Sequence, residues 1–163
     1  MIFVTLGTER YPFPRLLQCV EKAIESGLIL DDVLAQTGYT RFESEYFRTV
    51  DFLEYEQMVE ATERCDLLIG HAGEGTTILA LSMGKVPIVV PRRSSLGEHV
   101  DDHQIEFARR LDHLGKVLMA FEEEELLDRI VRYKEYCLKL AQSDSSNSRE
   151  RLIEYLSELC SGK

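Results

Sequence analysis

The segment from residue 70 to residue 77, Gly-His-Ala-Gly-Glu-Gly-Thr-Thr, has the composition of an anion-binding loop. Gly73 and Gly75 would let a ligand approach the backbone closely, and Thr76 and Thr77 would add hydroxyl donors. A helical pattern follows the loop, so free N–H groups and a helix dipole would face the same ligand. The segment predicts a diphosphate site, and the alternative is a tight strand-to-helix turn without a ligand.

Two ionisable side chains of this segment each allow two interpretations. His71 follows an apolar run, where it is a potential donor to phosphate or a partner of a loop carbonyl. Glu74 stands at the mouth of the same site, and we expect it to cap its own helix or to face solvent.

A second polar loop runs from residue 91 to residue 104 and is longer than a simple connection needs. Arg92 and Arg93 offer forked donors to phosphate, or they are solvated surface residues. The loop ends at a helical pattern that starts with three polar residues, Asp102, His103 and Gln104. These residues either cap the helix or bind the hydroxyl groups of a sugar.

The spacing of His99 and His103, with Asp102 between them, raises the question of a metal. No third ligand has a familiar spacing, and the glutamate of an H-E-x-x-H motif is missing, so we expect no metal centre. Glu98 and His99 are candidates for a general base by position and chemistry alone. The chain also lacks a Walker lysine pattern and a G-x-G-x-x-G fingerprint, which disfavours P-loop enzymes and dinucleotide-binding dehydrogenases.

Short β-prone runs alternate with helical patterns along the chain. The runs are residues 2–6, 33–36, 47–52, 66–69, 86–90 and 117–120, and one long helix is expected from Glu122 onward. This alternation predicts an α/β fold, a Rossmann-like parallel sheet of about six strands with helices on both faces. Ligands of such sheets bind beyond the carboxyl ends of the strands. Four loops should therefore converge on one crevice, those at Gly7-Thr8, at Gly38, at 71–77 and at 92–104.

One domain is expected over residues 1–142, because the chain shows one apolar pattern and no internal repeat. Residues 143–163 form a polar break followed by a helix over 149–159. The leucine stripe of that helix would pack on the domain or dock a partner.

The net charge of −10 argues against nucleic acid and against an anionic membrane surface, because such a field repels phosphates. Any phosphate must therefore be captured locally. The four cysteines are scattered without a C-x-x-C pair and are expected to be reduced thiols. Without a signal peptide or a run of roughly 20 apolar residues, we expect a cytoplasmic protein that reaches a membrane only through a partner.

Three ordered motifs, at residues 66–77, 84–92 and 98–104, resemble the C-terminal, donor-binding half of GT-B glycosyltransferases of family 28. More narrowly, the chain is similar to stand-alone PssE-type subunits of bacterial exopolysaccharide and capsule glycosyltransferases. The eukaryotic cousin is the soluble subunit of the transferase that adds N-acetylglucosamine to a dolichol-linked sugar. The resemblance spans most of the chain, from residues 5–8 to the C-terminal helix.

The resemblance implies roles for particular residues. It assigns the UDP diphosphate to His71, Gly73, Gly75, Thr76 and Thr77, with Gly7 and Thr8 beside the reacting phosphate. It assigns the donor sugar to Asp102, His103 and Gln104, and Arg92 would join the diphosphate site. Many relatives carry a glutamate that binds the ribose where this chain has Leu79, so the ribose contact is in question.

The resemblance also implies a function. The chain would be the UDP-sugar-binding subunit of a two-component glycosyltransferase that transfers a hexose to a lipid-linked glycan in exopolysaccharide or capsule biosynthesis. A membrane-associated partner subunit would bind the acceptor, and the reaction would need no cofactor or metal. The alternative is a non-catalytic enhancer that activates or stabilises that partner. The sugar, the acceptor, the general base and the oligomeric state are not encoded in these motifs.

Overall fold

The computed structural model describes residues 1–143 together with residues 153 and 157. The expected division at residue 143 therefore stays a prediction, because most of the helix expected over 149–159, and Cys160, lie outside the described residues.

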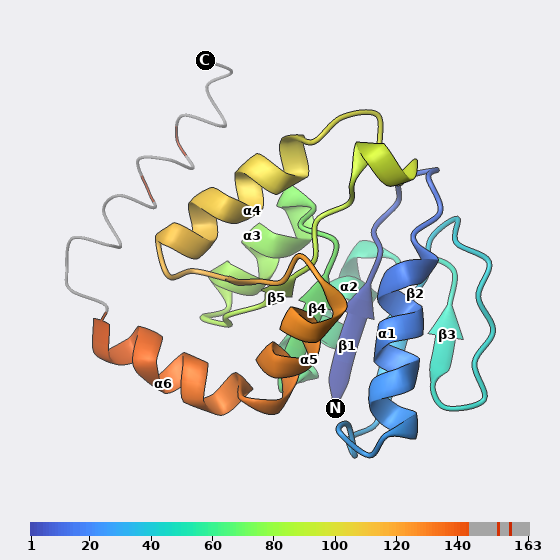
Figure 1. The fold of residues 1–163 in the computed structure, drawn as a ribbon, viewed down its shortest axis with the longest axis horizontal. Helices are drawn as coiled ribbons and strands as arrows, with labels where there is room; N and C mark the ends of the chain where they lie inside the picture. The colour runs from blue at the N-terminus through green and yellow to red at the C-terminus, as the bar shows by residue number, and fades with distance from the viewer. Residues whose placement is uncertain (144–152, 154–156, 158–163) are drawn as a thin grey trace.

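A six-stranded parallel sheet forms the centre of the molecule, with the strand order β3-β2-β1-β4-β5-β6 (Figure 1). The strands are β1 (Ile2–Thr5), β2 (Val33–Gln36), β3 (Arg48–Val50), β4 (Leu67–Gly70), β5 (Ile88–Val89) and β6 (Leu118–Met119). The helices are α1 (Pro14–Glu25), α2 (Tyr55–Arg64), α3 (Glu74–Ser82), α4 (His103–His113), α5 (Glu123–Val131) and α6 (Tyr133–Ser143), with a short 3-10 turn at Ser94–Leu96. The predicted Rossmann-like fold is confirmed.

The alternation of side chains along β1 explains why helices cover both faces of the sheet. Ile2 and Val4 pack with residues of α1 and α5, whereas Phe3 packs with residues of α2 and α3. Val89 of β5 packs in a further hydrophobic cluster with residues of α4. Because the central strands are buried on both faces, their sequences are mostly apolar, and the polar residues Thr5 and Gln36 stand at the carboxyl ends of β1 and β2.

The strand order reverses direction at β1, which pairs with β2 on one side and with β4 on the other. The loops that follow β1 and β4 therefore diverge at the carboxyl edge of the sheet. A crevice opens at such a switch point, and ligands of doubly wound folds bind there.

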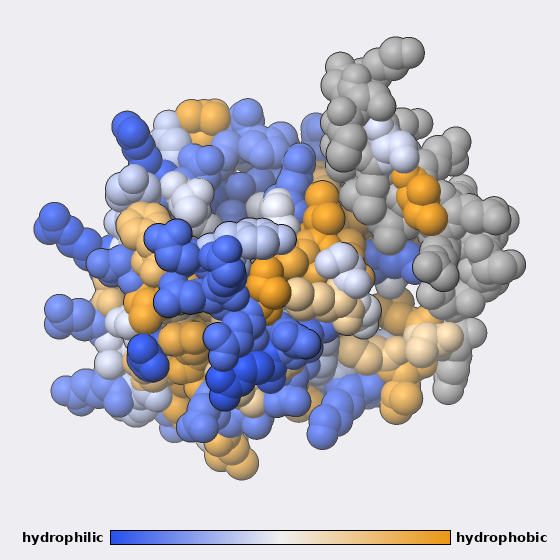
Figure 2. All heavy atoms as spheres, turned by 180° about the vertical axis from the view of Figure 1, so that it is seen from behind, coloured by the Kyte–Doolittle hydropathy of each residue, from blue (hydrophilic) through white to orange (hydrophobic). Residues whose placement is uncertain are grey.

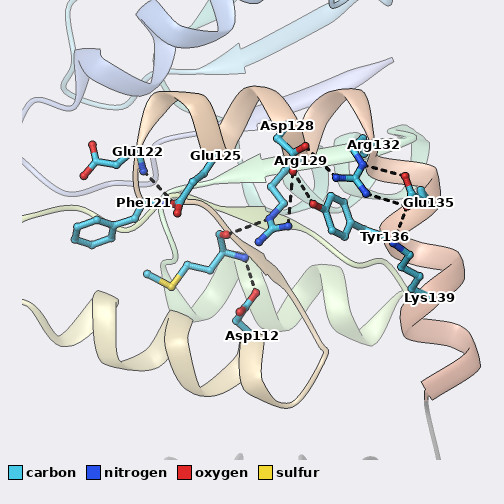
Figure 3. Close-up of polar contacts among 11 residues, drawn as sticks. Asp112, Phe121, Glu122, Glu125, Asp128, Arg129, Arg132, Glu135, Tyr136 and Lys139 are labelled. Carbon is cyan, nitrogen blue, oxygen red and sulfur yellow. Dashed lines mark hydrogen bonds and ion pairs between the residues drawn. The ribbon is translucent and has the colours of Figure 1, made fainter.

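The single long helix expected from Glu122 is wrong, because the chain bends at Arg132 and forms two helices, α5 and α6. Figure 3 shows the bend: the ring of Tyr136 lies 4.4 Å from the guanidinium of Arg129 and 5.1 Å from that of Arg132. The Tyr136 hydroxyl donates to Asp128 at 2.6 Å. These contacts stabilise the bend, which helical periodicity alone does not reveal.

The described surface is mixed in polarity. On the face seen in Figure 2, hydrophilic side chains surround smaller patches of hydrophobic ones. Among the described residues, no helix combines the length and the apolar character that crossing a bilayer demands.

Candidate functional site

A cleft of about 770 Å³ lies at the carboxyl ends of β1, β2 and β4. It is lined by Gly7, Thr8, Glu9, Gln36, Leu53, Tyr55, Met58, His71, Gly73, Glu74, Gly75, Thr76, Ile78, Leu79, Ser82, His99, His103 and Gln104. A second hollow of about 730 Å³ lies beside the amino ends of β1 and β2, near Asp31 and Asp32, and contains none of the predicted site residues. The first cleft is the candidate site, because it occupies the switch point.

The cleft brings together most of the residues predicted from the sequence, namely Gly7, Thr8, His71, Gly73, Gly75, Thr76, His99, His103 and Gln104. Four predicted residues do not line it: Thr77, Glu98, Arg92 and Asp102. Three of the four expected loops contribute to it. The fourth loop, at Gly38, packs closely against the loop at Gly7, since a Cβ on Gly38 would lie only 2.4 Å from the carbonyl oxygen of Gly7.

The start of α3 presents unpaired N–H groups to the cleft. Gly73 is the N-cap residue and has no side chain that could bond to the first turn. The first helical hydrogen bond runs from the N–H of Thr77 to the carbonyl of Gly73 at 3.0 Å. The N–H groups of Glu74, Gly75 and Thr76 precede it and have no partner within the helix, which is the arrangement that binds anions. Thr77 is buried beneath them.

The ring of His71 packs against two glycines, where a side chain would leave no room for it. A Cβ on Gly7 would lie 2.4 Å from its Cε1, and a Cβ on Gly73 would lie 2.2 Å from its Nε2. Gly7 also has a φ of +70°, a conformation that glycine adopts without strain. Ala72 has a φ of +62°, which is unusual for a residue with a side chain. Backbone strain of this kind concentrates at ligand sites. The positive φ of Ala72 lies at the turn between β4 and α3.

The environment of His71 keeps its ring neutral. Burial, followed by the nearby positive charge of Arg92, lowers the pKa of His71 to about 4. Its Nδ1 lies 3.3 Å from the carbonyl oxygen of Thr5. A carbonyl only accepts, so Nδ1 carries the hydrogen in this contact, and Nε2 is unprotonated in the neutral ring. His71 therefore donates to a phosphate only after its ring gains a second proton, which an adjacent anion favours.

The structure gives Arg92 a different position from the one predicted. Its side chain is buried, and its guanidinium donates to the carbonyls of Leu6, Tyr11 and Glu98. It also stacks on Phe13, at 4.9 Å from the ring centre. Because burial removes water from the guanidinium, the pKa of Arg92 falls to about 10. Arg92 thus ties the two loops together outside the cleft lining, and its position does not support direct contact with a diphosphate.

Glu98, a candidate general base, is engaged elsewhere. Its carboxylate accepts two hydrogen bonds from Arg15, each 3.0 Å long, and one from the backbone N–H of Arg93. Only 6% of its side chain is exposed, so it lies in a nearly buried ion pair away from the cleft. Asp102 is exposed and accepts the N–H of Ser94 at 2.9 Å, which closes the second loop.

Several cleft residues were missed in the sequence. Gln36 accepts the hydroxyl of Thr5 at 2.5 Å and donates to the carbonyl of Gly7 at 3.3 Å, so it positions the β1 loop. A polar residue that ends an apolar strand was the available signal. The apolar wall formed by Leu53, Tyr55 and Met58 had no such signal, because it depends on how α2 is placed against the sheet.

A family model described as the glycosyltransferase family 28 C-terminal domain matches residues 1–159. The UDP-N-acetylglucosamine transferase subunit ALG13 of Yarrowia lipolytica is 26% identical over 119 residues, which cover 71% of this chain and 59% of that protein. The subunit of the same name from Homo sapiens is 32% identical over 122 residues, which cover 70% of this chain and 10% of that protein. The chain thus matches less than two thirds of either relative.

Solved glycosyltransferases share the fold. SnogD from Streptomyces nogalater aligns with a TM-score of 0.57 at 22% identity, over 86% of this chain and 38% of that one. MurG from Acinetobacter baumannii aligns with a TM-score of 0.56 at 17% identity, over 85% of this chain and 41% of that one. At these identities the likeness shows the fold alone.

Proposed function

The chain belongs to the glycosyltransferase family 28 C-terminal domain family, and we propose that it binds the UDP-sugar donor of a two-subunit glycosyltransferase. The observation that carries the proposal is one cleft that combines the open N-terminus of α3 with an apolar wall. The relatives described as UDP-N-acetylglucosamine transferase subunits make UDP-N-acetylglucosamine the first donor to test.

The diphosphate would lie at the start of α3. The N–H groups of Glu74, Gly75 and Thr76 and the helix dipole would stabilise the negative charge that develops on UDP as the bond to the sugar breaks. His71, once protonated, would add a donor from the floor of the cleft. This is electrostatic stabilisation of a leaving group, and it requires no metal.

Different groups of the cleft lining suit the different parts of a nucleotide sugar. Leu53, Tyr55 and Met58 offer an apolar surface for the base. Leu79 lines the cleft as well, and its side chain has no group that could bond to ribose hydroxyls. His103 and Gln104, at the start of α4, offer polar groups to the sugar.

The acceptor would be held by another subunit. We infer that a membrane-associated partner binds a lipid-linked glycan of exopolysaccharide or capsule synthesis, and that a hexose is transferred to it. The family resemblance and the word subunit in the names of the relatives support this proposal. Of the two candidates for a general base, only His99 lines the cleft. Because another subunit would hold the acceptor, the isolated chain is expected to be nearly inactive.

Calorimetric titration with UDP and UDP-sugars tests donor binding. His71→Ala and Thr76→Val should each weaken UDP binding sharply, because both residues line the cleft. His113→Ala is the matched control, since this residue lies at the far end of α4 and outside the cleft lining. Unchanged affinity in both cleft variants would contradict the proposed site.

A second candidate function is a non-catalytic enhancer of the partner, and the apolar Leu79 is the observation that favours it. Reconstitution separates the two functions. If His71→Ala no longer binds UDP but still restores full transfer when it is mixed with the partner, the enhancer function is correct. If transfer is lost together with UDP binding, the donor-binding function is correct.

A further inference from the structure

Two histidines and one aspartate come together where the second loop enters α4. Single ligand atoms from His99, Asp101 and His103 all lie within 4.8 Å of one another. Both Nδ1 atoms approach the same carboxylate oxygen, Oδ1 of Asp101, at 3.3 Å for His99 and 2.5 Å for His103. We propose that these three side chains bind a divalent transition-metal ion of the Zn²⁺ type.

The chemistry of the three donors selects the class of ion. Imidazole nitrogens suit Zn²⁺, Co²⁺, Ni²⁺ and Cu²⁺, and a carboxylate oxygen completes a familiar mixed set. Mg²⁺ prefers an octahedron of oxygens and would gain little here. Three protein ligands leave at least one position open, as in zinc sites that exchange a water molecule.

The separations of Asp101 from the two imidazoles lie within about 1 Å of those that a bound ion needs. In a tetrahedral zinc site, bonds of about 2.1 Å place neighbouring ligand atoms roughly 3.4 Å apart. The Nδ1 of His99 and the Oδ1 of Asp101 already have this separation. The contact between Asp101 and His103 must open by about 1 Å to match that geometry. Both side chains are more than half exposed, so they have room to do so.

His99 supplies the fixed part of the site. Only 6% of its side chain is exposed, its ring lies 6.0 Å from that of Tyr11, and its Nδ1 accepts the backbone N–H of Asp101 at 3.3 Å. In the absence of an ion, the carboxylate of Asp101 lies 2.5 Å from Nδ1 of His103 and accepts the backbone N–H of His103 at 3.1 Å. The loop is therefore partly organised before an ion arrives, which reduces the cost of binding.

The electrostatic field around the cluster contains opposing contributions. The positive end of the α4 dipole, where His103 lies, disfavours a cation. Two carboxylates, those of Asp101 and Asp102, stand in the same turn and carry negative charge at neutral pH. The chain as a whole carries a charge of −10. The negative side chains outweigh the half charge of one helix end.

A metal was not expected from the sequence, because Asp102 stands between the two histidines and no third ligand has a familiar spacing. The loop conformation instead turns Asp101 toward both imidazoles and directs Asp102 to the N–H of Ser94. His99 and His103 also line the cleft, so the ion would lie in its wall. Binding of the ion does not depend on the proposed donor function.

Titration of the reduced, metal-free chain with Co²⁺ tests the site, because cobalt bound to nitrogen and oxygen ligands gives visible absorption bands. We expect about one ion per chain, displaced by Zn²⁺ and not by Mg²⁺. Asp101→Asn and His103→Ala should weaken binding at least as much as the roughly 10- to 100-fold that loss of a second-shell partner costs. His113→Ala, on the same helix, should bind as the wild type does.

The proposal is overturned if no visible band develops with the wild-type chain. It is also overturned if Asp101→Asn and His103→Ala bind cobalt with unchanged affinity, and thiol-to-cobalt charge-transfer bands would then identify cysteine ligands instead. Circular dichroism of each variant shows that the chain is folded. UDP titration of the same samples gives an independent result, so loss of UDP binding with cobalt binding retained would refute only the donor function.

Discussion

The close packing of His71 between two glycines predicts the effect of Gly73→Ala. The φ of −69° and ψ of 132° at Gly73 are ordinary for alanine, so the backbone itself would not be strained. The new Cβ would lie 2.2 Å from Nε2 and 2.5 Å from Cε1 of His71. Because the imidazole is buried, either the ring or the loop must move.

Overpacking of this kind typically costs about 1–3 kcal/mol, and we expect Gly73→Ala to lower the free energy of unfolding by that amount. Gly75→Ala is a matched control in the same loop, because its Cβ would have nothing within 4 Å. Gly75 also lies in the first turn of α3, where alanine is favoured over glycine by up to about 1 kcal/mol. The two substitutions should therefore change stability in opposite directions.

Urea denaturation of the two variants, of His71→Ala and of the double variant His71→Ala/Gly73→Ala measures the clash directly. Removal of the ring removes the obstacle, so Gly73→Ala should cost much less in the His71→Ala background. The coupling energy in this cycle should be roughly 1–3 kcal/mol, as expected for residues in contact.

The clash is refuted if Gly73→Ala unfolds at the wild-type urea concentration, or if the effects of His71→Ala and Gly73→Ala are additive. UDP titration separates stability from binding. Gly75→Ala adds a methyl group to the wall of the cleft, so it should weaken UDP binding although the fold is more stable than the wild type.

Buried ionisable side chains of the same region yield three more expectations. The pKa of His71 is about 4 in the folded chain and about 6.5 in the unfolded chain. Between these pH values the unfolded chain binds more protons, so the stability of the fold decreases as the pH falls from 6.5 towards 4. Urea midpoints at pH 7.5 and pH 5 should therefore differ less in His71→Gln than in the wild type. Arg92→Met leaves three carbonyls without their donor and should cost roughly 2–4 kcal/mol in urea denaturation, whereas an unchanged midpoint would contradict its role between the loops. Glu98→Gln should lower the free energy of unfolding by roughly 1–3 kcal/mol, because Arg15 loses its charged partner but is partly exposed and keeps some hydration. A loss confined to transfer activity would instead support Glu98 as a base.

Local patterns in the sequence were sufficient for the sheet and for the loop after β4. Apolar runs separated by helical patterns encode a parallel sheet directly, because each strand must be covered on both faces. The glycines of residues 70–77 likewise indicated the turn into α3, because small residues and a helix start are local features. The bend at Arg132 was not predicted, because it depends on contacts that Tyr136 makes with neighbouring side chains.

The sequence by itself determined which loops carry polar chemistry and at which edge of the sheet they meet, because periodicity and glycine placement act over a few residues. Only the tertiary structure decided the direction of each side chain within those loops. It buried Arg92 under three carbonyls, paired Glu98 with Arg15 and turned Asp101 toward two histidines. The first two outcomes depend on groups 86 and 83 positions apart in the chain, and the third depends on the conformation of a loop, so no local pattern records which groups will meet.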